Sequence, residues 1–383
     1  MYIPRSLENA VKSAEKSFPV IVITGPRQSG KSTLLKHYLK KEASYISLDD
    51  PNFRKLLADN PLDYLSNLKK PVIIDEIQYL PELTSFIKIL VDQKRSPGSW
   101  YITGSQQFPL MKNISETLAG RAAVLSLPTF SVSERGKNND LNSCLMSSSY
   151  PELYTNKNIN SGMWYSSYLQ TYLERDVRMI MDIGNLRDFE QFIRILAGRT
   201  GCELSLSALS RDLGVSVPTI KRWTSVLEAS YIIFLIPPYY KNFGKRIIKS
   251  PKLYFYDLGL VNYLIGNKDI DLLINSPMAG AIFETFVISE IIKKKYALGI
   301  KPEMYFWRSQ SGIEIDLITD IDGVLSPVEI KLSSSIKPQF YKNLEYFIEL
   351  DKTKNVKGYL ITNCKEDIPL PKKIKNFYWS DFF

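Results

Sequence analysis

The sequence predicts an α/β protein whose N-terminal part is a parallel β-sheet with helices on both faces. Short apolar, β-branched stretches alternate there with segments whose apolar residues recur at helical spacing. Alternation at this spacing implies a parallel sheet covered on both faces. A glycine loop follows the first stretch, and paired acids end the third. The predicted strands are 20–24, 45–48, 71–75, 100–104 and 122–127.

Length and composition bound the class of protein. A chain of 383 residues is long enough for two or three domains, and 44% hydrophobic with 23% charged residues describes a soluble globular protein. No apolar run approaches the roughly 20 residues of a membrane span. The first residues, MYIPRSLENA, show no signal-peptide pattern. We therefore expect a cytoplasmic location and no membrane partner.

The cysteines and the single histidine exclude some chemistries. Cys144, Cys202 and Cys364 have no partner at C-x-x-C spacing, so neither a zinc site nor a disulfide framework is indicated. His37, the only histidine, lies in the helical segment after the glycine loop. Hydrolytic chemistry in this chain would therefore use carboxylates, lysine and metal ions instead of a histidine base.

The glycine loop, GPRQSGKS at 25–32, fits the phosphate-binding pattern G-x-x-x-x-G-K-[ST], the Walker A motif or P-loop. Its glycines allow backbone geometry that other residues resist, and the loop amides and helix N-terminus would point at phosphates. Lys31 would reach the β- and γ-phosphates of ATP, and the Ser32 hydroxyl would ligate Mg²⁺. The flanking strand and helix disfavour a chance match in a turn. The predicted nucleotide-binding residues are Gly25, Pro26, Arg27, Gln28, Ser29, Gly30, Lys31, Ser32 and Thr33.

The third predicted strand ends in paired carboxylates, as in a Walker B motif. In PVIIDEIQ at 71–78, Asp75 follows Lys31 by 44 residues and would hold the water shell of Mg²⁺. Glu76 would polarise the attacking water. The alternative is an ordinary strand end with solvated acids.

The fourth predicted strand also ends in polar residues. In SWYITGSQQF at 99–108 these are Thr103, Ser105 and Gln106. Ligands of open α/β sheets bind at the carboxyl ends of the strands, so these side chains could sense the γ-phosphate.

The middle of the chain predicts a linker, helices and a helix-turn-helix. Residues 136–160 lack apolar periodicity and are expected to form a linker or mobile loop, and 162–198 read as two or three amphipathic helices. Residues 205–230 have helix-turn-helix patterning, with Gly214 at the turn and Ser216 as the second N-cap. Expected strands at 231–238 and 252–257, joined by a basic loop, would complete a winged helix.

Positive charge is concentrated in this middle segment. The chain carries a net charge of +9, and residues 194–256 contain ten basic against three acidic residues. One interpretation is that the module binds DNA phosphates. The other is a structural spacer or docking surface, because fold does not imply function. The candidate nucleic-acid contacts are Arg211, Thr219, Lys221, Arg222, Lys245, Arg246 and Lys249.

The C-terminal third predicts a β-hairpin that carries acids. Strands at 312–319 and 324–332 are joined by a segment ending in Asp322-Gly323, a strong two-residue turn signal. With this turn, facing residue numbers sum to 645. Asp316 then lies opposite Glu329, and Lys331 points to the same face.

Carboxylates set opposite each other repel, and a bound divalent cation would remove that cost. Together with Glu284 from a preceding helix, Asp316 and Glu329 have the layout of a metal-dependent nuclease, with Mg²⁺ as the metal. Lys331 would orient or deprotonate the water. The alternative is a hairpin in which Lys331 neutralises its acidic neighbours.

These motifs follow one another in an order that resembles a known family. IPRSLE, GPRQSGKSTLL, SLDDPNFR, VIIDEIQ, TGSQQF, LAGR, YPEL and YLERDV are similar to segments of the prokaryotic AAA+ superfamily ATP-binding proteins with a C-terminal domain of unknown function. The C-terminal domain resembles PD-(D/E)XK nucleases. The resemblance implies that Asp75 and Glu76 are the Walker B pair and that Ser105 lies in the sensor strand region. It also makes Arg121 a candidate arginine finger or sensor, acting within the chain or on a neighbour.

Two departures from the family pattern concern specific segments. Ser147–Ser149 replace glycines found before YPEL in many relatives, and SGIEID stands where a proline-aspartate pair is typical of the nucleases. The expected domains are an AAA+ type ATPase domain (1–135), a linker and helical region (136–200), a winged-helix-like module (201–257) and a nuclease-like domain (258–383).

The expected function is that of a Mg²⁺-dependent AAA+ ATPase, an ATP hydrolase that couples ATP binding and hydrolysis to DNA engagement. The alternative is a regulatory scaffold that binds a protein partner and has a catalytically inactive nuclease-like domain. A third hypothesis is ATP-gated nuclease activity. The sequence is also compatible with an oligomer.

Overall fold

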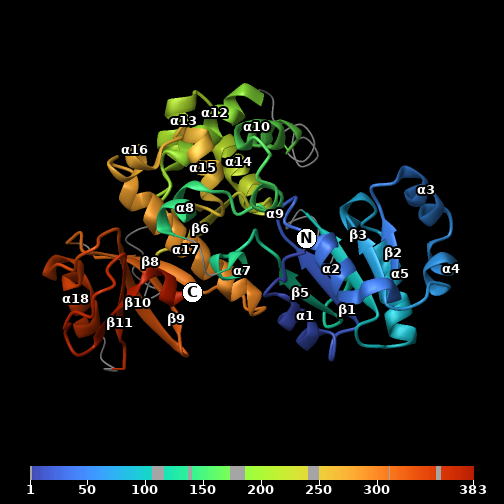
Figure 1. Ribbon diagram of the computed structural model, residues 1–383. Coiled ribbons are helices and arrows are strands. Elements are labelled where there is room, and N and C mark those ends of the chain that lie inside the picture. The colour runs from blue at the N-terminus through green and yellow to red at the C-terminus, as the bar shows by residue number, and fades with distance from the viewer. Residues whose placement is uncertain are drawn as a thin grey trace.

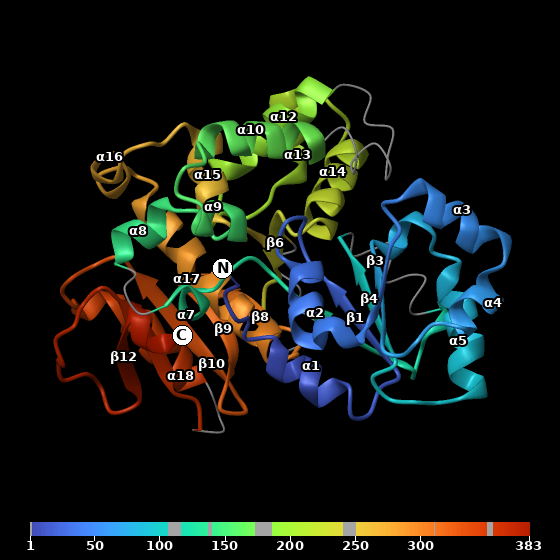
Figure 2. The same ribbon diagram turned by 45° about the vertical axis from the view of Figure 1, so that its right-hand side comes forward.

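The computed structural model (Figure 1) describes residues 2–105, 116–136, 140–172, 186–239, 250–309, 311–350 and 355–383. An N-terminal sheet and a C-terminal sheet lie on opposite sides of the molecule, and the helices of the middle segment lie to one side of the line joining them (Figures 1 and 2). Within the described ranges, no helix combines the length and apolar character required to span a bilayer.

The N-terminal sheet has five strands in the order β2-β3-β4-β1-β5, and its strand pairs are parallel. The predicted α/β class with a parallel N-terminal sheet is confirmed. Residues 20–24 pair with both 100–104 and 122–126, so the carboxyl ends of these strands meet at one edge. The strands are β1 (Val20–Thr24), β2 (Ser44–Ser47), β3 (Val72–Asp75), β4 (Trp100–Gly104) and β5 (Ala122–Ser126).

Helices cover both faces of this sheet, as the sequence predicts. Val20 and Val22 of β1 belong to one apolar cluster and Ile21 and Ile23 to another, because successive side chains of a strand point to opposite faces. The first cluster includes Ile87 of α5, and the second includes residues of α1 and α2. The helices of this part are α1 (Glu8–Ala14), α2 (Lys31–Leu39), α3 (Pro51–Asp59), α4 (Pro61–Ser66) and α5 (Leu83–Gln93).

The segment 136–160 is not the linker or mobile loop that the sequence predicts. Its described part contains two short helices, α8 (Leu141–Met146) and α9 (Pro151–Thr155). The buried carboxylate of Asp257 holds the chain between them, since Oδ2 accepts hydrogen bonds from the backbone N–H (2.6 Å) and the hydroxyl (2.8 Å) of Ser149. The serines that replace the expected glycines therefore have a structural partner more than one hundred residues away.

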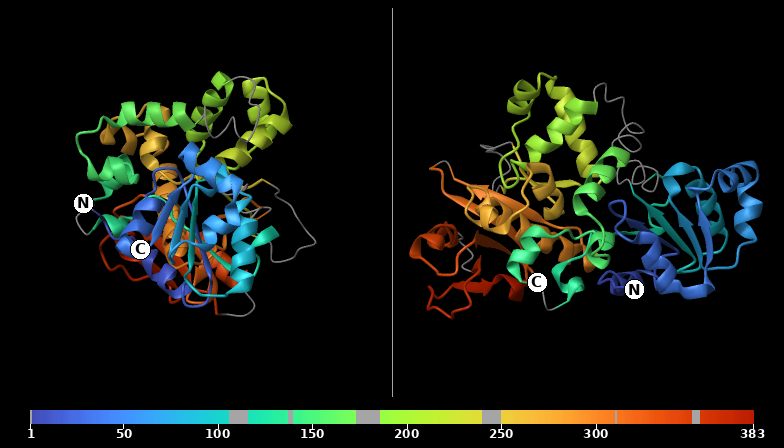
Figure 3. Two further views of the ribbon diagram at one scale, coloured as in Figure 1. Left: turned by 90° about the vertical axis from the view of Figure 1, so that its right-hand side faces the viewer. Right: turned by 45° about the horizontal axis from the view of Figure 1, so that its top comes forward.

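The middle helices form one apolar core with residues of the C-terminal part. The segment 173–185 lies outside the described residues. In the left view of Figure 3 these helices lie above the two sheets. They are α10 (Ser161–Tyr172), α12 (Leu186–Ala197), α13 (Leu206–Leu213), α14 (Val217–Ala229), α15 (Leu258–Ile265) and α16 (Ile270–Ile274).

The predicted helix-turn-helix consists of α13 and α14. Gly214 ends α13 with φ 69°, in the left-handed region that favours glycine. The hydroxyl of Ser216 caps α14 by accepting from the N–H of Thr219 at 3.3 Å. An antiparallel pair follows, β6 (Ile233–Ile236) and β7 (Lys252–Phe255), and the basic connection at 240–249 lies outside the described residues.

The C-terminal part is a five-stranded mixed sheet in the order β12-β11-β10-β9-β8. Helix α18 (Lys342–Leu350) packs on one face of it, and α17 (Ala279–Ala297) packs against the opposite face and the middle helices. Helix α17 also contacts α1 and β5, so it reaches all three parts of the chain. The strands are β8 (Met304–Arg308), β9 (Glu314–Ile321), β10 (Val324–Lys331), β11 (Gly358–Thr362) and β12 (Ile374–Tyr378).

The predicted hairpin register is confirmed. Residue 321 faces 324 and residue 317 faces 328, so facing numbers sum to 645. The turn residues Asp322 (φ 53°) and Gly323 (φ 80°) both have positive φ, as a two-residue turn between twisted strands requires.

Candidate active site at the P-loop

The P-loop joins β1 to α2 at the carboxyl edge of the N-terminal sheet. Gly25 has φ 147°, and a Cβ atom there would lie 2.1 Å from the carbonyl oxygen of Leu127. Gly30 has φ 89° and directly precedes α2. Glycine is therefore required at Gly25 by both conformation and close approach, and favoured at Gly30 by conformation.

The side chain of Lys31 lies folded against its own loop. Its buried ammonium group donates to the carbonyl oxygens of Gly25 (3.1 Å) and Pro26 (2.8 Å). The positive charge is thus already held where the loop would cradle phosphate.

Three hydroxyl groups converge on the carboxylate of Asp75. Ser32 donates to Oδ1 at 2.8 Å and Thr103 donates to the same oxygen, while Tyr45 donates to Oδ2 at 2.6 Å. Burial, and then the hydrogen bond to Asp75, raise the pKa of Tyr45 well above its usual range. A serine hydroxyl beside an aspartate carboxylate is an all-oxygen donor set, and these are the ligands that Mg²⁺ takes in phosphate-binding sites.

Glu76 adopts a left-handed backbone conformation, with φ 59° and ψ 49°. Such a conformation costs energy for a non-glycine residue and is concentrated at functional sites. Its N–H donates to Oγ1 of Thr103 at 3.1 Å. Its carboxylate accepts hydrogen bonds from Gln78 and, at 3.4 Å, from the hydroxyl of Ser105. The structure therefore brings Ser105 and Glu76 together at the end of β3 and β4.

Arg121 is not brought to this edge. It directly precedes β5, whose pairing with β1 runs in parallel from Ala122 to Ser126, so it lies about 17 Å along the strand direction from the P-loop edge. Its guanidinium forms an exposed ion pair with Asp92 at 2.5 Å. The expectation that Arg121 acts within the chain on a nucleotide at this edge is therefore wrong.

Several residues near the P-loop were not identified from the sequence. Arg5 donates to the carbonyl oxygen of Ser29 at 2.7 Å, and the hydroxyl of Tyr231 lies 2.7 Å from Oγ1 of Thr24. Tyr45 and Gln78 contact the two acids directly. Arg5 and Tyr231 are 24 and 207 residues from their partners, and no local pattern signals such contacts.

In the C-terminal hairpin, the side chains of Asp316, Glu329 and Lys331 meet as predicted. The ammonium group of Lys331 lies 2.9 Å from Oδ2 of Asp316 and 2.7 Å from Oε2 of Glu329. Burial works against the charge of Asp316, but Lys331 and Lys252 hold the pKa of this carboxyl below its usual range. Burial and the charge of Asp316 raise the pKa of Glu329 well above its usual range.

The carboxylate of Glu284 forms an ion pair with Lys252. Lys252 lies 3.2 Å from Oε1 of Glu284 and 2.5 Å from Oε1 of Glu314. Across the described ranges, no three histidine, cysteine or acidic side chains are grouped so that they could hold a metal ion. Within the described residues, Glu284, Asp316 and Glu329 therefore do not form a grouped set of three metal ligands; Lys331 pairs with Asp316 and Glu329, and Lys252 pairs with Glu284.

The candidate nucleic-acid contacts are only partly described. Arg211 of α13 and Lys221 and Arg222 of α14 are exposed. Thr219 is half-buried, and its hydroxyl lies 2.8 Å from that of Ser216. Lys245, Arg246 and Lys249 lie outside the described residues.

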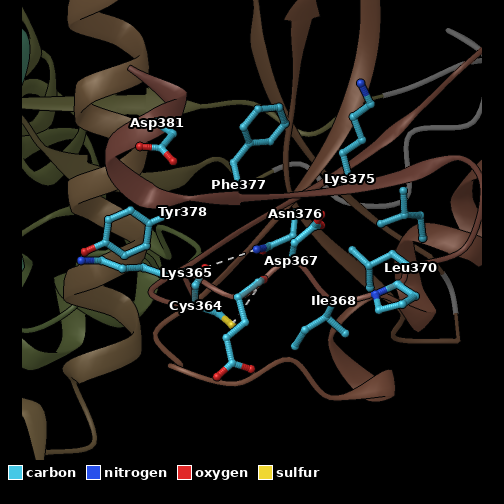
Figure 4. A pocket seen from close by; sticks show the side chains of 13 residues that line it. Cys364, Lys365, Asp367, Ile368, Leu370, Lys375, Asn376, Phe377, Tyr378 and Asp381 are labelled. Atoms are coloured by element: carbon cyan, nitrogen blue, oxygen red, sulfur yellow. Dashed lines mark hydrogen bonds between the residues drawn. The ribbon is translucent and has the colours of Figure 1, made fainter.

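A cavity of about 550 Å³ lies beside β11 and β12 (Figure 4). Lys365 lies over the ring of Tyr378, with 5.1 Å between the ammonium nitrogen and the ring centre. The lining includes Asp367 and Asp381 but none of the predicted site residues. This cavity is therefore separate from the P-loop site.

Three known families match successive parts of the chain. Residues 17–136 match the family described as an AAA domain. Residues 138–271 and 279–382 each match a domain of unknown function, DUF8612 and DUF4143 respectively. The uncharacterized proteins Rv2008c of Mycobacterium tuberculosis and Mb2031c of Mycobacterium bovis are each 32% identical over 319 residues, which cover 83% of this chain and 71% of theirs.

The chain belongs to the same family as these two mycobacterial proteins. Its N-terminal part is an ATP-binding domain of the P-loop type, with the P-loop and Asp75 inside the matched range. Among solved structures, this AAA-domain protein is similar to the Walker-type ATPase PABY2304 of Pyrococcus abyssi, with 15% identity, a TM-score of 0.44, and 67% and 94% of the two chains covered. It is also similar to a point variant of RuvB from Thermotoga maritima, with 17% identity, a TM-score of 0.29, and coverage of 60% and 87%.

Proposed function

We propose that this protein binds Mg²⁺-ATP at the P-loop and hydrolyses it, with Glu76 as the base that activates water. The observation that carries the proposal is the 2.8 Å hydrogen bond between the hydroxyl of Ser32 and the carboxylate of Asp75. Ser32 follows the phosphate-binding lysine, and Asp75 ends β3. The two residues are 43 positions apart in the sequence but are in direct contact. Serine and aspartate hold Mg²⁺ together in P-loop NTPases.

Binding would begin at the amides of the loop and the N-terminus of α2, which favour anions. Lys31 would exchange the carbonyl oxygens of Gly25 and Pro26 for phosphate oxygens. Mg²⁺, held by Ser32 and Asp75, neutralises charge on the phosphates when it is bound. Thr103 and Tyr45 would keep the Asp75 carboxylate oriented, because each donates a hydrogen bond to it.

Glu76 follows Asp75 directly and is the acid available to accept a proton from water. Its backbone is fixed by the Thr103 contact, and its carboxylate accepts from Ser105 and Gln78. Ser105 and Gln78 would hold that carboxylate until a γ-phosphate and its attacking water replace these contacts. General-base catalysis of this kind contributes about 10²–10⁴-fold.

The test separates binding from turnover in purified protein. Lys31→Ala should weaken ATP binding, whereas Glu76→Gln should keep binding and lower turnover by about 10²-fold or more. Glu82→Gln, an exposed acid at the start of α5, is the matched control and should leave both unchanged. Equal loss of binding in Lys31→Ala and Glu76→Gln would refute the role of Glu76, and a wild-type protein that binds no ATP would refute the function.

A second proposal concerns DNA as the partner of the ATPase. It is supported by the exposed positions of Arg211, Lys221 and Arg222, none of which forms an ion pair within the part of the chain that the structure describes. Unpaired exposed cations can neutralise phosphates. The ATP hydrolysis rate should rise with either double- or single-stranded DNA, using Glu76→Gln as the blank. An unchanged rate together with absent DNA binding at low salt would contradict this proposal.

The alternative is a regulatory ATPase whose C-terminal domain binds a protein partner and cleaves nothing. The bridging position of Lys331 between Asp316 and Glu329 favours it, because the lysine already neutralises the carboxylates. No nuclease activity should then appear with Mg²⁺ or Mn²⁺. Cleavage that is abolished by Asp316→Ala or Lys331→Ala would overturn this alternative and establish ATP-gated nuclease activity as the next hypothesis to test.

A further inference from the structure

The buried side chain of Arg5 contacts the P-loop from outside the nucleotide-binding motif. Its Nη1 donates to the carbonyl oxygen of Ser29 at 2.7 Å, and its Nη2 donates to that of Pro128 at 2.7 Å. The guanidinium group also lies over the ring of Phe130, 4.8 Å from its centre. Only 3% of the Arg5 side chain is exposed.

The Ser29 contact orients a group that faces the phosphates. The carbonyl oxygen of Ser29 and the N–H of Gly30 belong to one planar trans peptide unit, so they point in opposite directions. Holding the oxygen on Arg5 therefore directs the N–H away from Arg5. Gly30 has φ 89° and no Cβ, so this peptide unit would rotate freely without a clamp.

Arg5 is in turn held by Glu134 of α7 (Val132–Arg135). Its Nε donates to Oε1 of Glu134 at 3.1 Å, and both side chains are almost fully buried. The same oxygen accepts from the N–H of Ser6 at 2.8 Å, and Oε2 accepts from the N–H of Ser131 at 3.0 Å. Glu134 therefore links Arg5 directly to the start of α7.

A buried ion pair on α17 holds the start of α7 from the other side. Oε2 of Glu290 accepts from the N–H of Val132 at 2.7 Å, and Lys293 donates to the carbonyl oxygen of Phe130 at 3.2 Å. Glu290 and Lys293 are 2.9 Å apart, with 1% and 3% of their side chains exposed. Polar contacts thus run without interruption from α17 to Ser29 of the P-loop.

We propose that Arg5 is a positioning residue for the P-loop and that α17, through Glu134, sets its position and so controls nucleotide affinity. The proposal rests on the P-loop being the nucleotide site. Arg5 acts through the Ser29–Gly30 peptide unit and contacts no part of the nucleotide. Because the loop holds phosphates common to ATP and ADP, both affinities should depend on Arg5.

The experiment compares nucleotide dissociation constants and thermal stability in the full-length protein. Measurements use the Glu76→Gln background to prevent turnover. Arg5→Met should weaken ADP and ATP binding by about tenfold. Arg5→Lys should recover only part of the loss, because lysine restores the positive charge but lacks the planar guanidinium group that donates to two carbonyl oxygens at once. Glu134→Gln, which retains the Arg5 side chain but removes the charge and one acceptor oxygen that hold it, should weaken binding less than Arg5→Met and provides a second variant if Arg5→Met does not fold.

Val11→Ala is the stability control, since Val11 is buried in α1 and makes only apolar contacts there. It should lower the melting temperature while dissociation constants stay within about twofold of the parent. Binding by folded Arg5→Met and Glu134→Gln within twofold of the parent would overturn the proposal. So would a loss of binding in Val11→Ala equal to that in Arg5→Met.

The link to α17 is tested with a double variant that combines Glu290→Gln and Lys293→Met. It should weaken binding several-fold when Arg5 is present and add nothing when Arg5→Met is present, because coupled residues are not additive. Additive losses would overturn the link to α17. Lys31→Ala distinguishes a failure of the proposed nucleotide site from a failure of the proposed role of Arg5. If Lys31→Ala does not weaken nucleotide binding, the proposed nucleotide site is wrong. If Lys31→Ala weakens binding but the Arg5 and Glu134 variants do not, only the role of Arg5 is wrong.

Discussion

The phenolic hydroxyl of Tyr231 lies 2.7 Å from Oγ1 of Thr24 and 3.1 Å from Oγ of Ser126. Thr24 and Ser126 face each other at the carboxyl ends of β1 and β5, and Thr24 directly precedes Gly25 of the P-loop. Tyr231 follows α14 with φ 57° and is 1% exposed. Burial raises its pKa to about 12, so the hydroxyl keeps its proton. The middle helices are thereby joined to the N-terminal sheet beside the P-loop.

We expect Tyr231→Phe to lower the free energy of unfolding by about 1–2 kcal/mol, because the buried hydroxyls of Thr24 and Ser126 each lose a hydrogen-bond partner. Urea unfolding of Tyr231→Phe, Ser126→Ala and the double variant would measure it. The two changes should be less than additive, since Ser126→Ala removes a hydrogen-bond partner of the same hydroxyl. Strictly additive effects would contradict a shared hydrogen-bond network.

Two glycines with positive φ provide a matched comparison. Gly25→Ala should prevent formation of the P-loop and abolish nucleotide binding, because the new Cβ would lie 2.1 Å from the Leu127 carbonyl oxygen. Gly120 has φ 73°, and a Cβ atom added there would meet no atom within 4 Å, so Gly120→Ala should cost only about 1–2 kcal/mol of backbone strain. Circular dichroism melting and nucleotide titration check both variants, and equal effects would contradict the close-approach argument.

The buried carboxyl group of Glu284 predicts a pH dependence of stability. Burial and then the charge of Asp316 raise its pKa to about 7, against the attraction of Lys252. The folded state therefore binds this proton more tightly than the unfolded state. The resulting stabilisation is complete below the ordinary pKa of about 4.5 and is lost as pH rises through about 7.

Glu284→Gln should flatten this dependence, because glutamine cannot titrate but can still accept hydrogen bonds from Tyr254 and Lys252. Between pH 4.5 and 8 the wild type should lose up to about 3 kcal/mol more unfolding free energy than the variant. Urea unfolding at several pH values measures the difference. The exposed Glu349→Gln on α18 should behave like wild type, and a variant slope as steep as that of the wild type would show that another group titrates.

Salt dependence tests the proposed DNA contacts of α14. Replacing Lys221 and Arg222 together by alanine should reduce the slope of log affinity against log salt concentration by about two, one for each lost phosphate contact. The paired control is Lys12→Ala with Lys16→Ala, at and just after the end of α1, which are also exposed. An equal change in both double variants would assign the effect to net charge alone.

Local patterns were sufficient for much of the architecture. The N-terminal strands could be located because apolar runs end in glycine, acids or polar residues, and the hairpin register followed from Asp322 and Gly323. The segment 136–160 was misread as a linker because its helices are short and its anchor, Asp257, is distant in sequence.

The pairing of Ser32 with Asp75 was predictable because each residue ends or follows an element whose type and direction the sequence determines. The sequence by itself thus determined the parallel sheet, the P-loop and the facing acids of the hairpin. Only the tertiary structure decided that Arg121 lies at the opposite end of the strands from the P-loop, that Lys252 and Lys331 pair with the C-terminal acids, and that Arg5 and Tyr231 contact the P-loop region. The physical reason is that local periodicity sets elements and registers, whereas contacts between distant side chains depend on how whole elements pack.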